Sequence, residues 1–264
     1  MSRSSTNANT RLVWMLWLIA AATWYYWLLN VHIVTIGGGS NARELTFNSM
    51  LIHLLQGKLD VDPNTIGNEG FRFGEKVYTY FGIFPALLRM PLLFAGDFAR
   101  TDITLLSCFV ANCLMAAAKA TGAAIIWRRF GNDESAGLLP PFRVVSFLSG
   151  AQILFLQPSI YVEVCLWANV FASSFVLLVL YAWLNDRGFT TRILNGLAAL
   201  AGLCLLTRVS TAIGLWCSFA LIVGWMIFYA EEKRIFEKFR TKTPYIMPSV
   251  LILAIFAGIT GIVN

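Results

Sequence analysis

Long apolar runs, separated by short polar connections, dominate this sequence. Most have about the 20 residues that a helix needs to cross a bilayer. Because the runs are continuous rather than alternating, and because hydrocarbon excludes unpaired backbone amides, we expect helices. The sequence predicts an all-α, polytopic helical membrane protein with about seven transmembrane helices in a single membrane domain, 1–264. The runs occupy residues 12–36, 103–126, 144–161, 164–184, 193–208, 211–229 and 245–263.

One further apolar piece, residues 83–96, is too short to be a separate crossing. It contains Pro85, Arg89 and Pro91, which interrupt or charge a helix. We expect a half-span or an interfacial helix that leads into the run at 103–126.

The composition excludes a soluble domain. Hydrophobic residues make up 58% of the chain and charged residues 13%, whereas soluble proteins have about 45–50% and about 25%. The net charge of +6 would suggest nucleic acid in a soluble protein. Here it indicates cationic inner loops that face anionic membrane lipids, and we expect no nucleic-acid partner.

The distribution of basic residues predicts the orientation. With the N-terminus inside, the inner segments hold twelve of the 20 Lys and Arg residues, and the outer segment 37–102 holds six. This asymmetry follows the positive-inside rule, so we expect a multi-pass protein of the inner or plasma membrane. The chain ends at Asn264 directly after a span, and we therefore expect a portion truncated at its C-terminus.

The outer segment 37–102 is the only long polar region, and it holds seven of the 14 acidic residues. After the flexible Gly37–Ser40, the pattern predicts an amphipathic juxtamembrane helix over about residues 41–56, lying along the outer membrane surface. Gly57 is expected to end this helix, and residues 58–63 to form an extended piece that leads to a turn.

Three motifs carry a resemblance to a known family. They are LLQGKLD at 54–60, YTYFGIFPALLRMP at 78–91 and GLCLLTR at 202–208. With the first span and its acid-bearing helix, they resemble GT-C glycosyltransferases of the protein mannosyltransferase and aminoarabinose transferase group, over roughly residues 10–215. The resemblance implies sugar transfer from a polyprenyl-phosphate or dolichyl-phosphate carrier to a lipid, glycan or protein acceptor on the outer face.

The resemblance also implies a catalytic base at Glu44, on the helix that follows the first span. A partly desolvated carboxylate can accept a proton near neutral pH, as a base that activates an acceptor hydroxyl must. Glu44 could instead be a surface charge beside Arg43 or an acid that favours the helix dipole. Asp60 and Asp62 are secondary candidates, although Asp-Val-Asp-Pro could equally be only a turn.

Arg208 is the candidate for binding the donor phosphate. Charge inside a span is costly, so an arginine there either serves a function or extends to the headgroups. Glu163, another secondary acid, could orient the sugar or pair with Arg208, or be an exposed loop acid. His32 and His53 show no metal-ligand spacing.

Other signatures are absent from the sequence. It has no phosphate-binding loop, no dinucleotide fingerprint and no familiar protease or lipase motif. We expect no cofactor and no metal site, although the acids of 37–102 leave a divalent metal open. The alternatives to an enzyme are a transporter or flippase for lipid-linked saccharides, and a non-catalytic membrane protein.

Overall fold

The computed structural model describes residues 42–94, 97–130, 159–184, 188–228 and 235–263. All of them belong to one compact unit, Val34–Asn264. The predicted run 12–36 lies outside the described residues, as does nearly all of 144–161.

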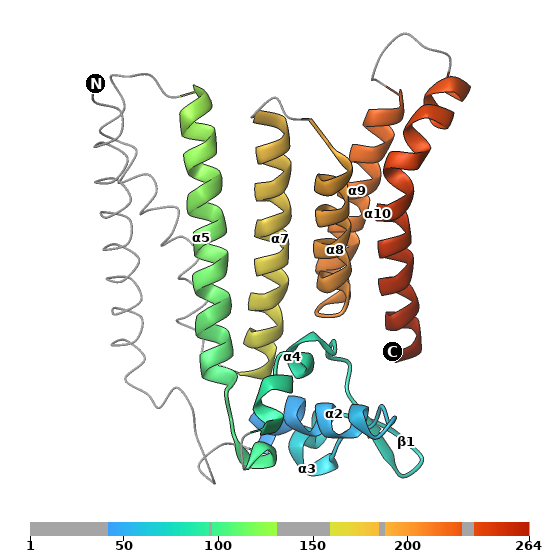
Figure 1. Cartoon of the computed structure of the whole chain (residues 1–264). Helices are drawn as coiled ribbons and strands as arrows, with labels where there is room; N and C mark the ends of the chain where they lie inside the picture. Colours follow the sequence, from blue (N-terminus) through green and yellow to red (C-terminus); the bar gives the residue numbers. More distant parts are fainter. Residues whose placement is uncertain (1–41, 95–96, 131–158, 185–187, 229–234, 264) are drawn as a thin grey trace. The chain divides into compact units, whose positions relative to one another are not determined.

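Within the described residues, the long helices are α5 (Thr104–Phe130), α7 (Ile160–Leu184), α8 (Thr191–Leu205), α9 (Val209–Phe228) and α10 (Ile235–Val263) (Figure 1). In this part of the chain, four stretches are long and apolar enough to cross a membrane, namely α5, α7, α9 and Pro244–Gly261 of α10. These four helices agree with the prediction of an α-helical membrane protein.

Helix α8 is shorter than the predicted span 193–208. Its 15 residues extend about 22 Å at about 1.5 Å per residue, less than the roughly 30 Å of a hydrocarbon core. It packs against α7, α9 and α10. Residues 206–208 form the turn to α9 instead of continuing the helix.

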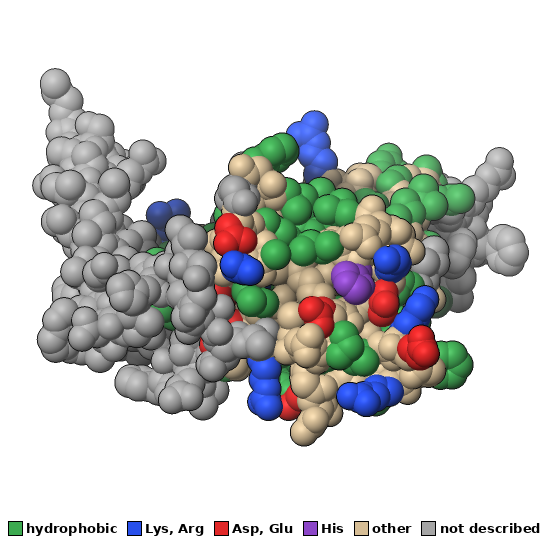
Figure 2. Space-filling model, turned by 90° about the horizontal axis from the view of Figure 1, so that it is seen from below, with side chains coloured by type: hydrophobic (Ala, Val, Ile, Leu, Met, Phe, Trp, Pro, Cys, Tyr) green, Lys and Arg blue, Asp and Glu red, His purple; other side chains and the backbone are tan. Residues whose placement is uncertain are grey.

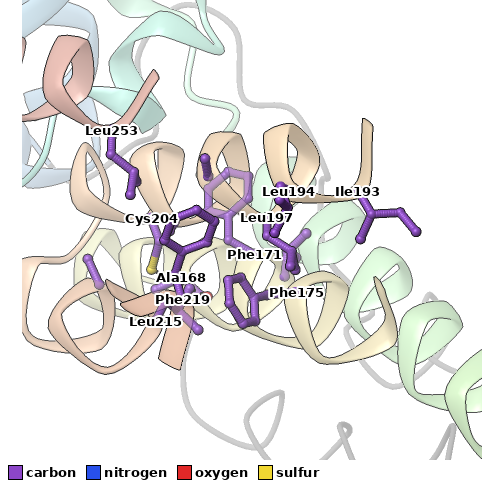
Figure 3. Close-up of a cluster of buried hydrophobic side chains, with 14 of the residues drawn as sticks. Ala168, Phe171, Phe175, Ile193, Leu194, Leu197, Cys204, Leu215, Phe219 and Leu253 are labelled. Atoms are coloured by element: carbon purple, nitrogen blue, oxygen red, sulfur yellow. Dashed lines mark hydrogen bonds between the residues drawn. The ribbon is translucent and has the colours of Figure 1, made fainter. Parts of the chain in front are cut away.

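Large apolar side chains fill the space between these helices (Figure 3). Phe171 and Phe175 of α7 and Leu197 of α8 belong to one buried cluster, together with Phe219 of α9. Gly202 of α8 lets α10 approach closely, because a Cβ atom there would lie 2.1 Å from the Phe256 ring. Dispersion and close packing hold helices together where lipid replaces water.

Residues 42–103, which we call the juxtamembrane segment, carry the short elements. Figure 2 shows acidic and basic side chains intermixed over the face that the segment presents. The segment has its own apolar core, which includes Phe47, Leu51 and Ile66. Its elements are η1 (Ala42–Leu45), α2 (Thr46–Leu55), α3 (Pro63–Ile66), η2 (Gly67–Glu69), β1 (Phe71–Phe73), β2 (Lys76–Tyr78), α4 (Phe84–Leu87), η3 (Met90–Phe94) and η4 (Phe98–Arg100).

Helix α2 ends as predicted but is not a surface helix with a free polar side. Gly57 takes φ +72°, and the amides of Gly57 and Lys58 donate to the carbonyls of Leu54 and His53, a Schellman ending. The first half of the polar side is covered: Thr46 and Ser49 are buried, and Thr46 donates to the carbonyl of Thr65 in α3. Farther along the same side, His53 is partly exposed and Gln56 is exposed, so the amphipathic pattern meets solvent only there.

The strands β1 and β2 form an antiparallel hairpin that the sequence analysis does not predict. Phe71 pairs with Tyr78 and Phe73 with Lys76, around a turn in which Gly74 has φ +62°. Glycine suits this position because tight hairpin turns require positive φ.

The juxtamembrane segment joins the helices at Gly82. The amide of Phe84 donates to the carbonyl oxygen of Leu206, in the turn between α8 and α9, at 3.0 Å. A Cβ atom at position 82 would lie 2.1 Å from that same oxygen. Only glycine permits this approach.

Replacement of Gly82 by alanine should therefore separate the segment from the α8–α9 turn. We expect the free energy of unfolding to fall by about 1–3 kcal/mol, as for other overpacked sites, measured in mild detergent titrated with SDS. Gly258→Ala is the matched control, because nothing lies within 4 Å of a Cβ atom there. Equal stability of the two variants would contradict the close approach.

Candidate functional site

A cavity of about 370 Å³ lies where the juxtamembrane segment meets the helices; we call it the polar cavity. Its wall comes from three places: Tyr80–Gly82, the first turns of α7, and the α8–α9 turn with the start of α9. Arg208 is the only charged residue among the described residues that line it. The cavity is therefore suited to an anion.

Arg208 precedes the first residue of α9. Its carbonyl accepts the amide of Ala212 at 3.1 Å, so the first amides of α9 have no carbonyl partner within the helix. The guanidinium is exposed, and its Nη1 donates to the Sγ of Cys165 at 2.6 Å. Within the described residues, Arg208 makes no ion pair, which leaves its charge available to a ligand.

A larger cavity of about 870 Å³, the apolar groove, adjoins the polar cavity. Tyr80, Leu205 and Val209 line both. The remainder of the groove wall comes mainly from β1 and β2, from α9 through Ile213, Trp216 and Cys217, and from the last turns of α10. A cationic end therefore leads directly into an apolar and aromatic groove.

Glu69 contacts a residue that lines the polar cavity. Its Oε2 accepts a hydrogen bond from the hydroxyl of Tyr80 at 3.3 Å. Tyr161 also lines the cavity, and its hydroxyl lies near Glu69 and Tyr80. Two phenols therefore share the wall of the polar cavity with Arg208, and one of them is hydrogen-bonded to the carboxylate of Glu69.

Glu163, which the sequence suggests could pair with Arg208, pairs with Arg89 instead. Both side chains are fully buried, and the Arg89 Nη1 and Nη2 donate to the Glu163 Oε1 and Oε2 at 2.8 and 2.9 Å. Arg89 Nε also donates to Asn48 Oδ1 at 3.0 Å, and its guanidinium lies 5.0 Å from the centre of the Phe47 ring. A carboxylate held in this way is structural and does not face the polar cavity.

Asp60 and Asp62 have local partners. The Asp62 carboxylate accepts the amide of Asn64 at 2.9 Å and caps α3, in agreement with the turn interpretation. Asp60 Oδ1 lies 3.1 Å from His53 Nδ1, and this hydrogen bond lowers the pKa of Asp60 below its ordinary value. Neither aspartate is among the residues that line the polar cavity.

Glu44 is half-buried in η1, and its carbonyl accepts a hydrogen bond from Thr104 Oγ1 at 3.4 Å. It is not among the residues that line the polar cavity or the apolar groove. The structure therefore does not bring Glu44 and Arg208 together in either cavity. The role of Glu44 as a base stays a prediction.

Sequence reasoning missed Glu69, Tyr80 and Tyr161 because nothing in their spacing links them. Arg89 did carry a signal, since a charge within an apolar piece needs a partner. The partner of Arg89 is Glu163, 74 positions away in the sequence. Hydrophobic periodicity cannot predict a contact between residues so far apart in the chain.

Among the described residues, no group of three or more His, Cys, Asp or Glu side chains could hold a metal ion. Comparison of the chain with models of protein families, with curated proteins and with solved structures found no match.

The buried ion pair yields a double-mutant test. Arg89→Met or Glu163→Leu alone leaves one buried charge without its partner, so each should lower the free energy of unfolding by about 3–5 kcal/mol. The double variant should lose less than the sum, because it leaves no isolated charge. SDS unfolding measures all three, with the exposed Lys58→Met as the control; strictly additive losses would contradict the pairing.

Proposed function

We propose that this protein is an integral membrane glycosyltransferase that transfers a sugar from a polyprenyl-phosphate carrier to an acceptor hydroxyl. One observation carries the proposal: Arg208, the only charged residue that the described part of the chain places in the wall of the polar cavity, lies where that cavity joins an apolar groove of about 870 Å³. The predicted topology puts this site on the outer face of the membrane.

The two cavities match the two halves of such a donor. Its phosphate is anionic, and a guanidinium binds phosphate through paired, charge-assisted hydrogen bonds. The amides at the start of α9 add partial positive charge beside Arg208. The carrier chain is apolar, and the groove offers Ile213 and Trp216 of α9 as its wall.

The proposed reaction is a direct displacement. The acceptor oxygen forms a bond to the anomeric carbon, while the bond from that carbon to the phosphate oxygen breaks. The phosphate leaves with the electron pair, and Arg208 stabilises its growing negative charge. A carboxylate takes the hydroxyl proton: Glu44 is the base that the resemblance implies, and Glu69 is the acid beside the polar cavity.

Transfer from a radiolabelled polyprenyl-phosphate sugar, by the full chain in proteoliposomes, tests the role of Arg208. Arg208→Ala should lower the rate about 10²–10³-fold, as the loss of one charge-stabilising donor does elsewhere, and Arg208→Lys should recover part of it. Arg100→Ala removes an exposed arginine of η4 as the control. Unchanged transfer by Arg208→Ala would contradict the role of Arg208 in binding the phosphate. If the unmodified protein binds the lipid but transfers no sugar, the proposal that it is a glycosyltransferase is wrong.

The same assay distinguishes the two bases. If Glu69 is the base, Glu69→Gln abolishes transfer and Glu44→Gln leaves most of it; the reverse result assigns Glu44. Transfer that survives both substitutions would exclude an acidic base at either position.

A further inference from the structure

The hairpin of β1 and β2 presents two phenylalanines that the protein itself does not cover. Phe71 is 64% exposed and Phe73 is 82% exposed, whereas Val77 on β2 is 4% exposed. Side chains alternate between the faces of a strand, so Phe71 and Phe73 share one face. The opposite face carries Val77 into the core of the juxtamembrane segment.

The hairpin is held firmly enough to present these rings in a fixed place. The amide of Val61 donates to the carbonyl of Val77 at 2.8 Å, which attaches β2 to the chain before α3. The ring of Phe71 packs edge-on against Tyr80, with 5.9 Å between their centres. The exposure of Phe73 is therefore a property of the fold rather than of a loose loop.

The hairpin lies beside the end of a candidate membrane span. Phe71 and Tyr78 line the apolar groove together with Thr260 and Gly261, and Gly261 is the last residue of the candidate span Pro244–Gly261. Phe71 is thus beside the end of the apolar stretch of α10, and a helix that crosses a membrane passes from acyl chains to headgroups where its apolar stretch ends.

The charges on the hairpin favour the same surroundings. Lys76 is paired directly with Phe73, and Arg72, which is also exposed, is paired with Val77 on the opposite face of the hairpin. Glu75 in the turn is the one acid of the hairpin. In a typical interfacial anchor, aromatic rings lie at the boundary between headgroups and acyl chains, and Lys and Arg side chains extend back to the lipid phosphates.

We propose that the hairpin Phe71–Tyr78 inserts its phenylalanine face into the membrane interface and that Lys76 and Arg72 bind anionic lipid headgroups. It thereby fixes the mouth of the apolar groove at the level of the lipid boundary. This proposal does not depend on sugar transfer, because a transporter or a non-catalytic protein with this hairpin would insert it equally.

Spin-label accessibility of the full chain in vesicles tests the insertion. The label is attached at Phe73→Cys, with Cys113, Cys165 and Cys217 replaced by serine, because these are the cysteines of the chain that are not buried. Asn68→Cys in the same background is the control, an exposed position of η2 before the hairpin. We expect the label at 73 to collide mainly with oxygen, which concentrates in lipid, and the label at 68 mainly with a water-soluble nickel chelate.

The charged residues form a second arm of the test. With Lys76→Glu, the label at 73 should move toward the nickel reagent in vesicles of phosphatidylcholine with phosphatidylglycerol, and much less in phosphatidylcholine alone. Equal nickel accessibility at 73 and 68 would overturn the insertion. Shielding of position 73 from both reagents would assign the face to a protein contact instead, and the absence of any lipid dependence would overturn the role of the basic residues.

Discussion

The buried pair of Arg89 and Glu163 is the constraint on which the arrangement of the site depends. Both side chains have no exposure to solvent, and two hydrogen bonds join them. Charges removed from water are tolerated only when they are paired and hydrogen-bonded. The pair therefore joins the juxtamembrane segment to the first turn of α7, and the contact of Gly82 with the α8–α9 turn completes the junction.

The junction creates a cavity in which a second arginine has the opposite situation. Arg89 is neutralised inside the protein, whereas Arg208 lines a cavity with no acidic partner among the described residues. A cavity with one unneutralised charge favours an anion, and the adjoining groove favours an apolar chain. An amphiphile with an anionic head would satisfy both, which is why we propose a lipid-linked phosphate rather than a soluble sugar nucleotide as the ligand.

Hydropathy predicted the four apolar helices of spanning length because the cost of polar groups in hydrocarbon acts on every residue of a run. The run at 193–208 forms the shorter helix α8, which packs against α7, α9 and α10. The end of α2 was predictable because Gly57 acts locally. The burial of Thr46 on the polar side of α2 was not predictable, since Thr46 donates a hydrogen bond to the carbonyl of Thr65, 19 positions away in the sequence.

In the candidate site too, residues marked by a local pattern could be predicted, and residues brought together by distant contacts could not. Arg208 could be selected as a candidate because a charge beside an apolar run is conspicuous by itself, and its role stays a prediction. For Glu163, both the pairing with Arg208 and the exposed loop acid were wrong, because only the tertiary structure buries this acid against Arg89. Glu69 and the two tyrosines gave no signal, since no local pattern brings them to one cavity.

The central claim is that one amphiphile occupies both cavities. Two native cysteines allow this claim to be tested. Cys165 lines the polar cavity and Cys217 the apolar groove, so alkylation by N-ethylmaleimide, followed residue by residue by mass spectrometry, reports on both. Polyprenyl phosphate should slow alkylation of both thiols, and polyprenol without phosphate should protect Cys217 much more than Cys165. Unchanged rates at both cysteines with saturating polyprenyl phosphate would contradict the account.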